Sequence, residues 1–173
     1  MIWFWTFTVY SFGGFLLELA YAAAVGGRRN RKGLLVLPLC PVYGLGACLI
    51  LLLPSRIQAW PWAVFLLGGV AATAAEYLDA LYHERVLGVT FWSYDGLPGN
   101  IQGRVCLPFS LIWGMLSLGL TYWVHPMLAG WLARIPEPVS WMALAAVAAD
   151  GLLSAALLRR SGDTACLQWY SRS

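Results

Sequence analysis

Charged residues are scarce in this chain. Only 11% of its 173 residues are Asp, Glu, Lys or Arg, whereas 60% are hydrophobic. Soluble domains have about 25% charged and roughly 45–50% apolar residues. This composition excludes a water-soluble fold, and the apolar segments leave no room for a soluble catalytic domain, a dinucleotide-binding unit or an ATPase domain. The sequence therefore predicts a membrane protein.

Histidine and cysteine are also rare. The two histidines, His83 and His125, are far apart in the sequence, and the four cysteines show no CxxC spacing. This pattern supports neither catalysis by a pair of histidines nor a zinc site. Three of the cysteines are expected at or near the reducing cytoplasmic face, which argues against disulfides. We expect no metal site, and the sequence identifies no cofactor.

Five apolar segments are long enough for a membrane crossing, which takes about 20 residues. They cover residues 2–25, 34–53, 60–82, 105–128 and 139–158. The predicted fold is an all-α bundle of five transmembrane helices. We expect one transmembrane domain over residues 1–158 and a short cytoplasmic tail over residues 159–173.

The distribution of basic residues predicts the topology. If the segments alternate across the membrane, only Arg56 and Arg134 face one side. The other side receives Arg28, Arg29, Arg31, Lys32, Arg85, Arg104, Arg159, Arg160 and Arg172. The positive-inside rule then places the N-terminus outside and the C-terminus in the cytoplasm. We interpret the net charge of +3 in this way and expect the lipid bilayer, not nucleic acid, as the partner.

The second segment is unusual for a membrane helix because Pro38 and Pro41 remove two backbone donors. Either its helix begins near Pro41 after an extended or re-entrant stretch, or the helix is broken there. Irregular backbone survives in lipid only where protein or water covers it. A start near Pro41 would point free N–H groups toward Arg31 and Lys32, an arrangement that favours an anionic group. The alternative is a packing kink.

Four acidic residues lie inside predicted helices: Glu18, Glu76, Asp79 and Asp150. A charge there costs a few kcal/mol and is usually kept for a partner or an aqueous cavity. All four fall in the predicted cytoplasmic half. We expect a polar, acidic cavity open to the cytoplasm. The alternative is that the acids pair with basic residues and only hold the bundle together.

The connection at residues 83–104 has turn signals at Asp95-Gly96 and at Pro98-Gly99-Asn100. It is too rich in aromatic residues to be disordered. Loops of this length are often functional. We expect an ordered loop that covers the cytoplasmic opening, with Trp92, Tyr94, Asn100 and Gln102 as lining residues. Alternatively, Trp92 and Tyr94 hold the loop at the lipid headgroups.

Several of these residues recur in the order of a known family pattern. They are Glu18, Gly33-Leu34-Leu35, Pro38-Leu39-Cys40-Pro41-Val42-Tyr43-Gly44, Glu76-Tyr77, Glu84, Phe91-Trp92-Ser93-Tyr94-Asp95, Pro98, Asn100, Gly103-Arg104-Val105-Cys106-Leu107 and Ser110-Leu111-Ile112-Trp113-Gly114. The succession resembles the small bacterial membrane proteins described as putative ABC-transporter type IV (CmpB-like), over about residues 10–120. The resemblance implies membrane transport without naming a substrate.

The chain departs from that family pattern at three places. Arg31-Lys32 stands where Asn-Arg is usual, and Leu37 replaces a glycine before Pro38. The Ser and Asp of the loop are exchanged in Trp92-Ser93-Tyr94-Asp95. A positive charge is kept at Lys32, but a planar, bidentate arginine contact would be lost. The carboxylate at position 95 would point elsewhere than one at position 93.

Transport and catalysis are the two functions considered. The first is a membrane transporter or transporter subunit with an acidic cavity open to the cytoplasm. The second is an intramembrane enzyme that acts on a lipid or prenyl phosphate at the cytoplasmic interface, with acids holding Mg²⁺ and basic residues neutralising phosphate. The sequence lacks the dense Asp motifs of a two-metal site, so transport is favoured.

A structural partner of a larger membrane complex is a third possibility. Five short helices enclose little space, so a homodimer or a larger complex is expected. The predicted location is the bacterial cytoplasmic membrane. The residues expected to bind substrate are Glu18, Lys32, Tyr43, Glu76, Tyr77, Trp92, Tyr94, Asn100 and Arg104.

Overall fold

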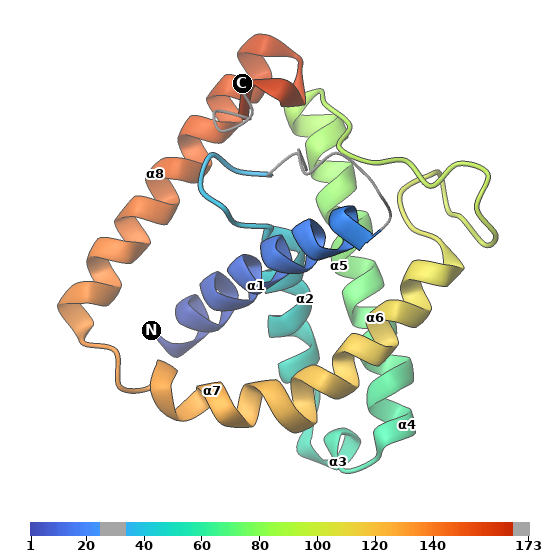
Figure 1. Ribbon diagram of the computed structural model, residues 1–173, viewed down its shortest axis with the longest axis vertical. Coiled ribbons are helices and arrows are strands. Elements are labelled where there is room, and N and C mark those ends of the chain that lie inside the picture. Colours follow the sequence, from blue (N-terminus) through green and yellow to red (C-terminus); the bar gives the residue numbers. More distant parts are fainter. Residues whose placement is uncertain (25–33, 168–173) are drawn as a thin grey trace.

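The computed structural model describes residues 1–24 and 34–167, and their regular structure is helical (Figure 1). Within these described ranges, four helices are long and apolar enough to cross a membrane. They are α1 (Ile2–Ala24), the continuous helix Pro61–Leu87, the continuous helix Leu107–Leu132 and α8 (Glu137–Ser161). The all-α membrane fold is therefore confirmed, whereas the number of five crossings stays a prediction.

The two middle helices each combine α-helical and π-helical turns. The first comprises α4 (Pro61–Ala63), η1 (Val64–Gly68), α5 (Gly69–Tyr82) and η2 (His83–Leu87). The second comprises α6 (Leu107–Gly119), η3 (Leu120–Val124) and α7 (His125–Leu132). The first runs five residues past its predicted end and stops where Gly88 takes a left-handed conformation, with φ of +71°. The predicted loop 83–104 is thus corrected to residues 88–106.

The second apolar segment begins as irregular backbone and becomes helical at Pro41. Helix α2 (Pro41–Leu51) has Pro41 in its first turn, where a missing N–H breaks no helical hydrogen bond. The predicted helix start at Pro41 is therefore confirmed, whereas a re-entrant course of the stretch before it stays a prediction. With 11 residues, α2 is about 16 Å long, against about 30 Å for a hydrocarbon core. The short helix α3 (Ser55–Gln58) follows it.

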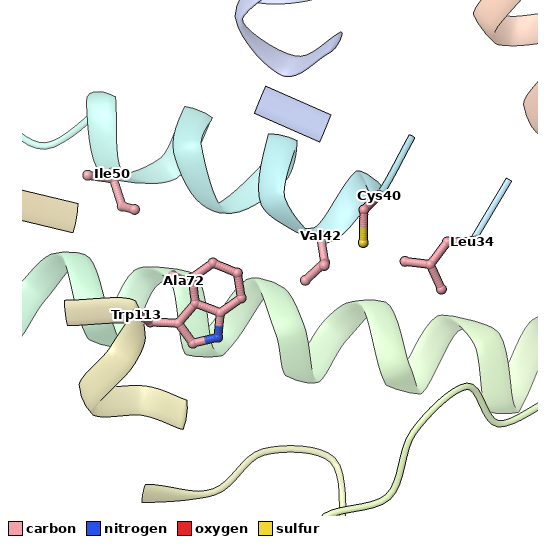
Figure 2. Packing of buried hydrophobic residues seen from close by; sticks show 6 residues of the cluster. All are labelled: Leu34, Cys40, Val42, Ile50, Ala72 and Trp113. Atoms are coloured by element: carbon pink, nitrogen blue, oxygen red, sulfur yellow. The ribbon is translucent and has the colours of Figure 1, made fainter. Parts of the chain in front are cut away.

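Helices α1, α2, α5 and α6 pack in series, each against the next. Figure 2 shows the buried cluster that joins α2, α5, α6 and the irregular segment before α2. It contains Leu34, Cys40, Val42, Ile50, Ala72 and Trp113. The α1–α2 contact is close because it uses glycine: a Cβ atom on Gly14 would lie 2.2 Å from the Tyr43 ring. Small residues allow such close approach between membrane helices.

Helix α8 stands along one side of the molecule (Figure 1). It packs against η2 and against the 3-10 turn η4 (Thr164–Leu167). Midway along α8, Asp150 Oδ1 accepts the backbone N–H of Leu37 at 3.1 Å, and Ser154 Oγ accepts that of Val36 at 3.0 Å. Side chains of α8 therefore bind the backbone donors that the non-helical segment leaves without helical partners.

The end of the Pro61–Leu87 helix, the 88–106 loop and the end of α8 lie toward one end of the molecule, and α3 and α4 lie at the other (Figure 1). The orientation in the membrane stays a prediction.

Candidate binding pocket

A pocket of about 450 Å³ lies between α1, α2, α5, α6 and the 88–106 loop. Most of its wall is aromatic or aliphatic, with two carboxylates among the side chains. The lining residues are Leu17, Glu18, Tyr21, Leu34, Cys40, Val42, Tyr43, Glu76, Phe91, Trp92, Tyr94, Phe109, Ile112, Trp113 and Leu116. A concave, mainly apolar site with a few placed polar groups is typical of small-molecule binding.

Glu76 is the more deeply buried of the two pocket acids, with 5% of its surface exposed. Its Oε1 accepts a hydrogen bond from the Tyr94 hydroxyl at 2.8 Å, and its Oε2 accepts one from the Trp113 indole N–H at 3.0 Å. Burying a polar group is costly unless it is hydrogen-bonded. Both donors are neutral, so they hold the carboxylate in place without neutralising it by an ion pair.

Glu18 reaches the same pocket from α1. The Tyr43 hydroxyl donates to Glu18 Oε1 at 2.6 Å. The Tyr43 ring in turn lies 4.8 Å from the Trp113 ring, centroid to centroid. Gly14, one turn before Glu18, leaves the space that the Tyr43 ring fills. The close α1–α2 contact thus sets the position of the Tyr43–Glu18 pair.

The contacts continue around the pocket. Tyr94 stacks on Phe109 with centroids 4.8 Å apart, and Phe109 meets the Tyr21 ring at 6.5 Å. Tyr21 lies three residues after Glu18 on α1, so both occupy the same face of that helix. We call the resulting ring of side chains the pocket belt: Glu18, Tyr43, Trp113, Glu76, Tyr94, Phe109 and Tyr21.

Five of the predicted site residues line this pocket: Glu18, Tyr43, Glu76, Trp92 and Tyr94. They come from α1, α2, α5 and the loop. Lys32 lies outside the described residues. The remaining three, Tyr77, Asn100 and Arg104, are placed elsewhere.

The sequence matches the family described as putative ABC-transporter type IV over residues 5–154. The chain belongs to this family. The match is longer than the expected 10–120 and includes most of α8, so the expectation that the fifth helix lies outside the resemblance is corrected. No curated protein and no solved structure matches the chain. The family assignment supports a membrane protein related to transport.

In this family member, Tyr77 points away from the belt although it follows Glu76 directly. Consecutive residues of an α-helix are rotated by about 100°, which places Tyr77 in a separate apolar groove between α5 and α6. Its hydroxyl donates to Gln102 Oε1 at 2.8 Å. Arg104 also donates to Gln102 and pairs with Glu84, Nη2 to Oε2, at 2.5 Å. Its hydrogen bond to Glu84 raises the pKa of Arg104.

The loop covers the pocket through Phe91, Trp92 and Tyr94. Its predicted turns are present, because Gly96 and Gly99 have φ of +83° and +64°. Asn100, which was expected to point inward, is exposed at the loop tip. Its Nδ2 donates to the Leu97 carbonyl at 3.0 Å, and its Oδ1 accepts from the Gly103 N–H at 3.3 Å. The side chain of Asn100 therefore closes the turn.

The other two intramembrane acids are buried away from this pocket. His83 Nδ1 donates to the Asp79 carbonyl at 2.7 Å and lies 3.6 Å from Asp79 Oδ2. Asp150 accepts the Leu37 N–H described above. The four acids, all predicted in the cytoplasmic half of the membrane, therefore lie in different parts of the fold.

Trp113, Phe109, Phe91 and Tyr21 line the pocket although they were not predicted as site residues. Trp113 had a sequence signal, since it lies in the Ser110–Gly114 run of the family pattern. Tyr21 also had a signal, since it lies three residues after Glu18 and so shares its helix face. Phe109 had none, because an aromatic residue in a membrane helix equally fits a lipid-facing position.

Proposed function

We propose that this protein is a membrane transporter or transporter subunit whose solute binds in the pocket between Glu18 and Glu76. The observation that carries the proposal is the convergence of two carboxylates, from α1 and α5, on one pocket walled by aromatic rings. Ionisable groups inside membrane helices generally mark a solute or ion pathway.

The partners of Glu76 support a binding role over a purely structural one. An acid that only holds the bundle together is expected to pair with a basic residue, as Glu84 does with Arg104, or with an otherwise unsatisfied backbone N–H, as Asp150 does with Leu37. Glu76 instead accepts from a phenol and an indole. A carboxylate can accept more than these two hydrogen bonds. Capacity therefore remains for a group of the solute.

The proposed membrane arrangement has five crossings, of which residues 34–53 form the second. The N-terminus is outside the bacterial cytoplasmic membrane and the C-terminus inside, and the pocket opens to the cytoplasm beneath the 88–106 loop. A homodimer or a larger complex completes the pathway. The division of basic residues, nine against two, supports this orientation. Cysteines introduced at Arg29 and Ser173 test it, because labelling of either by an impermeant reagent in intact cells would reverse it.

Uptake into inverted membrane vesicles tests transport, and vesicles from overproducing cells retain any partner subunit. The labelled probes are Na⁺, Mg²⁺, benzyltrimethylammonium and glycine betaine. We expect uptake of at least one probe above that of control vesicles. Glu18→Gln and Glu76→Gln are expected to abolish this uptake while the amount of folded protein is unchanged. Phosphate release from a prenyl diphosphate that depends on Glu76 would instead show an enzyme.

A further inference from the structure

We infer that the pocket belt binds an organic ammonium ion, with the charged head beside Glu76 and the apolar body against the aromatic wall. This inference rests on the proposed function, since it names the substrate class of the same pocket. Three observations carry it: the charge of the described lining residues, the arrangement of the rings and the volume of the pocket.

The charge of the described lining residues favours a cation. The lining residues that the structure describes include two carboxylates and no Lys, Arg or His. Both oxygens of Glu76 are held by the neutral donors Tyr94 and Trp113. An anionic head would face a buried carboxylate, which opposes its binding. A positive head would give Glu76 the ionic partner that it lacks among the described residues.

The rings select an organic cation over a metal ion. Glu76 lies between two aromatic pairs, because Trp113 contacts Tyr43 and Tyr94 stacks on Phe109. Aromatic faces attract ammonium groups, and cages of such rings recognise quaternary ammonium ligands. Ca²⁺ and Mg²⁺ require about six or more oxygen ligands, including water. A wall made mainly of rings and aliphatic side chains cannot supply that shell.

The volume fits an ion with an apolar body. About 450 Å³ lies within the roughly 300–1,000 Å³ of pockets that bind drug-sized molecules. Beyond the belt, the wall continues with aliphatic side chains that include Leu17, Leu34, Ile112 and Leu116. These side chains would contact a hydrocarbon portion of the ligand.

Two probes of equal shape test the inference on the purified full-length protein in lipid nanodiscs. Benzyltrimethylammonium carries a quaternary nitrogen where neopentylbenzene has a neutral carbon. We expect saturable binding of the ammonium at least about tenfold tighter than that of its neutral counterpart, which is the lower end of the effect of one close charge pair. Binding is measured by ligand-observed NMR, with competition by Mg²⁺.

Glu76→Gln removes the charge and keeps the size, and the loss of a close charge pair is expected to weaken ammonium binding at least about tenfold. Asp79→Asn is the matched control, because Asp79 lies three residues further along α5 and is similarly buried, at 8% exposure against 5%. Binding is expected to be unchanged in this control.

A second variant keeps the test decisive if Glu76→Gln fails to fold. Phe109→Leu keeps an apolar side chain but removes a ring face, and it is expected to weaken ammonium binding by about 2- to 30-fold. Its control is Phe65→Leu, since Phe65 lines the separate groove between α5 and α6. The neutral probe is expected to lose much less affinity in Phe109→Leu than the ammonium does.

Equal binding of both probes, displacement of the ammonium by Mg²⁺, or equal losses in Phe109→Leu and Phe65→Leu would overturn the inference. These failures differ from a failure of the proposed function. Uptake of Na⁺ or Mg²⁺ that requires Glu76, without ammonium binding, would retain transport and reject the substrate class. Ammonium binding without uptake of any probe would retain the site and reject transport.

Discussion

Glu76 on α5 and Asp150 on α8 are both buried acids in apolar helices, with 5% and 8% of their surface exposed, but they serve different regions. Glu76 accepts from two side chains and lines the pocket. Asp150 accepts from the backbone N–H of Leu37. The comparison shows that the cost of burying an acid in a membrane helix does not identify its role. The two acids differ in their donors, which are a phenol and an indole for Glu76 and a backbone N–H for Asp150.

The α8 region has a clear structural need. Residues 34–40 are not helical, so their N–H groups lack helical acceptors, and unsatisfied backbone is costly in lipid. Asp150 and Ser154 lie one turn apart and bind the consecutive N–H groups of Leu37 and Val36. The same segment supplies Leu34 and Cys40 to the pocket wall. Helix α8 therefore supports the pocket from outside it.

The largest expected effect separates the two acids by function. Glu76→Gln is expected to lower solute uptake at least about tenfold, because it removes a charged contact, with little change in thermal stability. Asp150→Asn, which keeps an acceptor for the Leu37 N–H, is expected to retain uptake. Vesicle uptake and thermal unfolding in detergent measure both variants. Equal uptake by the Glu76→Gln and Asp150→Asn variants would show that the two acids do not differ in function.

The next prediction concerns the close contact between α1 and α2 beside the pocket. Gly14→Ala places a methyl group 2.2 Å from the Tyr43 ring, so the ring or α1 must move. We expect a loss of about 3 kcal/mol in the free energy of unfolding, at the upper end for overpacking. Uptake is expected to fall as well, because Tyr43 no longer reaches Glu18. Gly13→Ala is the control, since its methyl group meets no atom within 4 Å. Similar behaviour of both variants would show that Tyr43 is not held by this contact.

A smaller effect is expected on the α8 side. Asp150→Ala removes the acceptor of the Leu37 N–H, and an unsatisfied buried donor costs about 1–3 kcal/mol. Thermal unfolding is expected to show a clear loss of stability in Asp150→Ala and little loss in Asp150→Asn. If both variants lose uptake without losing stability, Asp150 belongs to the transport site and the comparison fails.

The smallest expected effect tests whether Asn100 lies outside the binding site. Asn100→Ala removes two hydrogen bonds at the loop tip, each worth about 0.5–1.5 kcal/mol. Faster proteolysis of the 88–106 loop is expected, with uptake unchanged. Uptake lost as fully as in Glu76→Gln would instead place Asn100 in the site.

Local features were the most predictable from the sequence. The prolines predicted where α2 begins, and the glycines predicted the loop turns, because both residue types act on their own backbone dihedrals. The end of the Pro61–Leu87 helix was harder to predict, since the polar residues His83, Glu84 and Arg85 end the apolar run although the helix continues through them as π turns. Residues such as Asn100 were misplaced because a polar loop residue can serve the loop itself as well as a ligand.

The sequence by itself determined a membrane protein of apolar helices, because composition and segment length alone decide whether a chain is compatible with lipid. It also determined that a few acids inside those helices need partners. Only the tertiary structure decided which partner each acid has. Glu76 meets Trp113 and Tyr94 because α5, α6 and the loop converge, and Asp150 meets Leu37 because α8 lies against irregular backbone. These pairings depend on helix rotation and packing between distant segments, which the sequence pattern of a single helix does not contain.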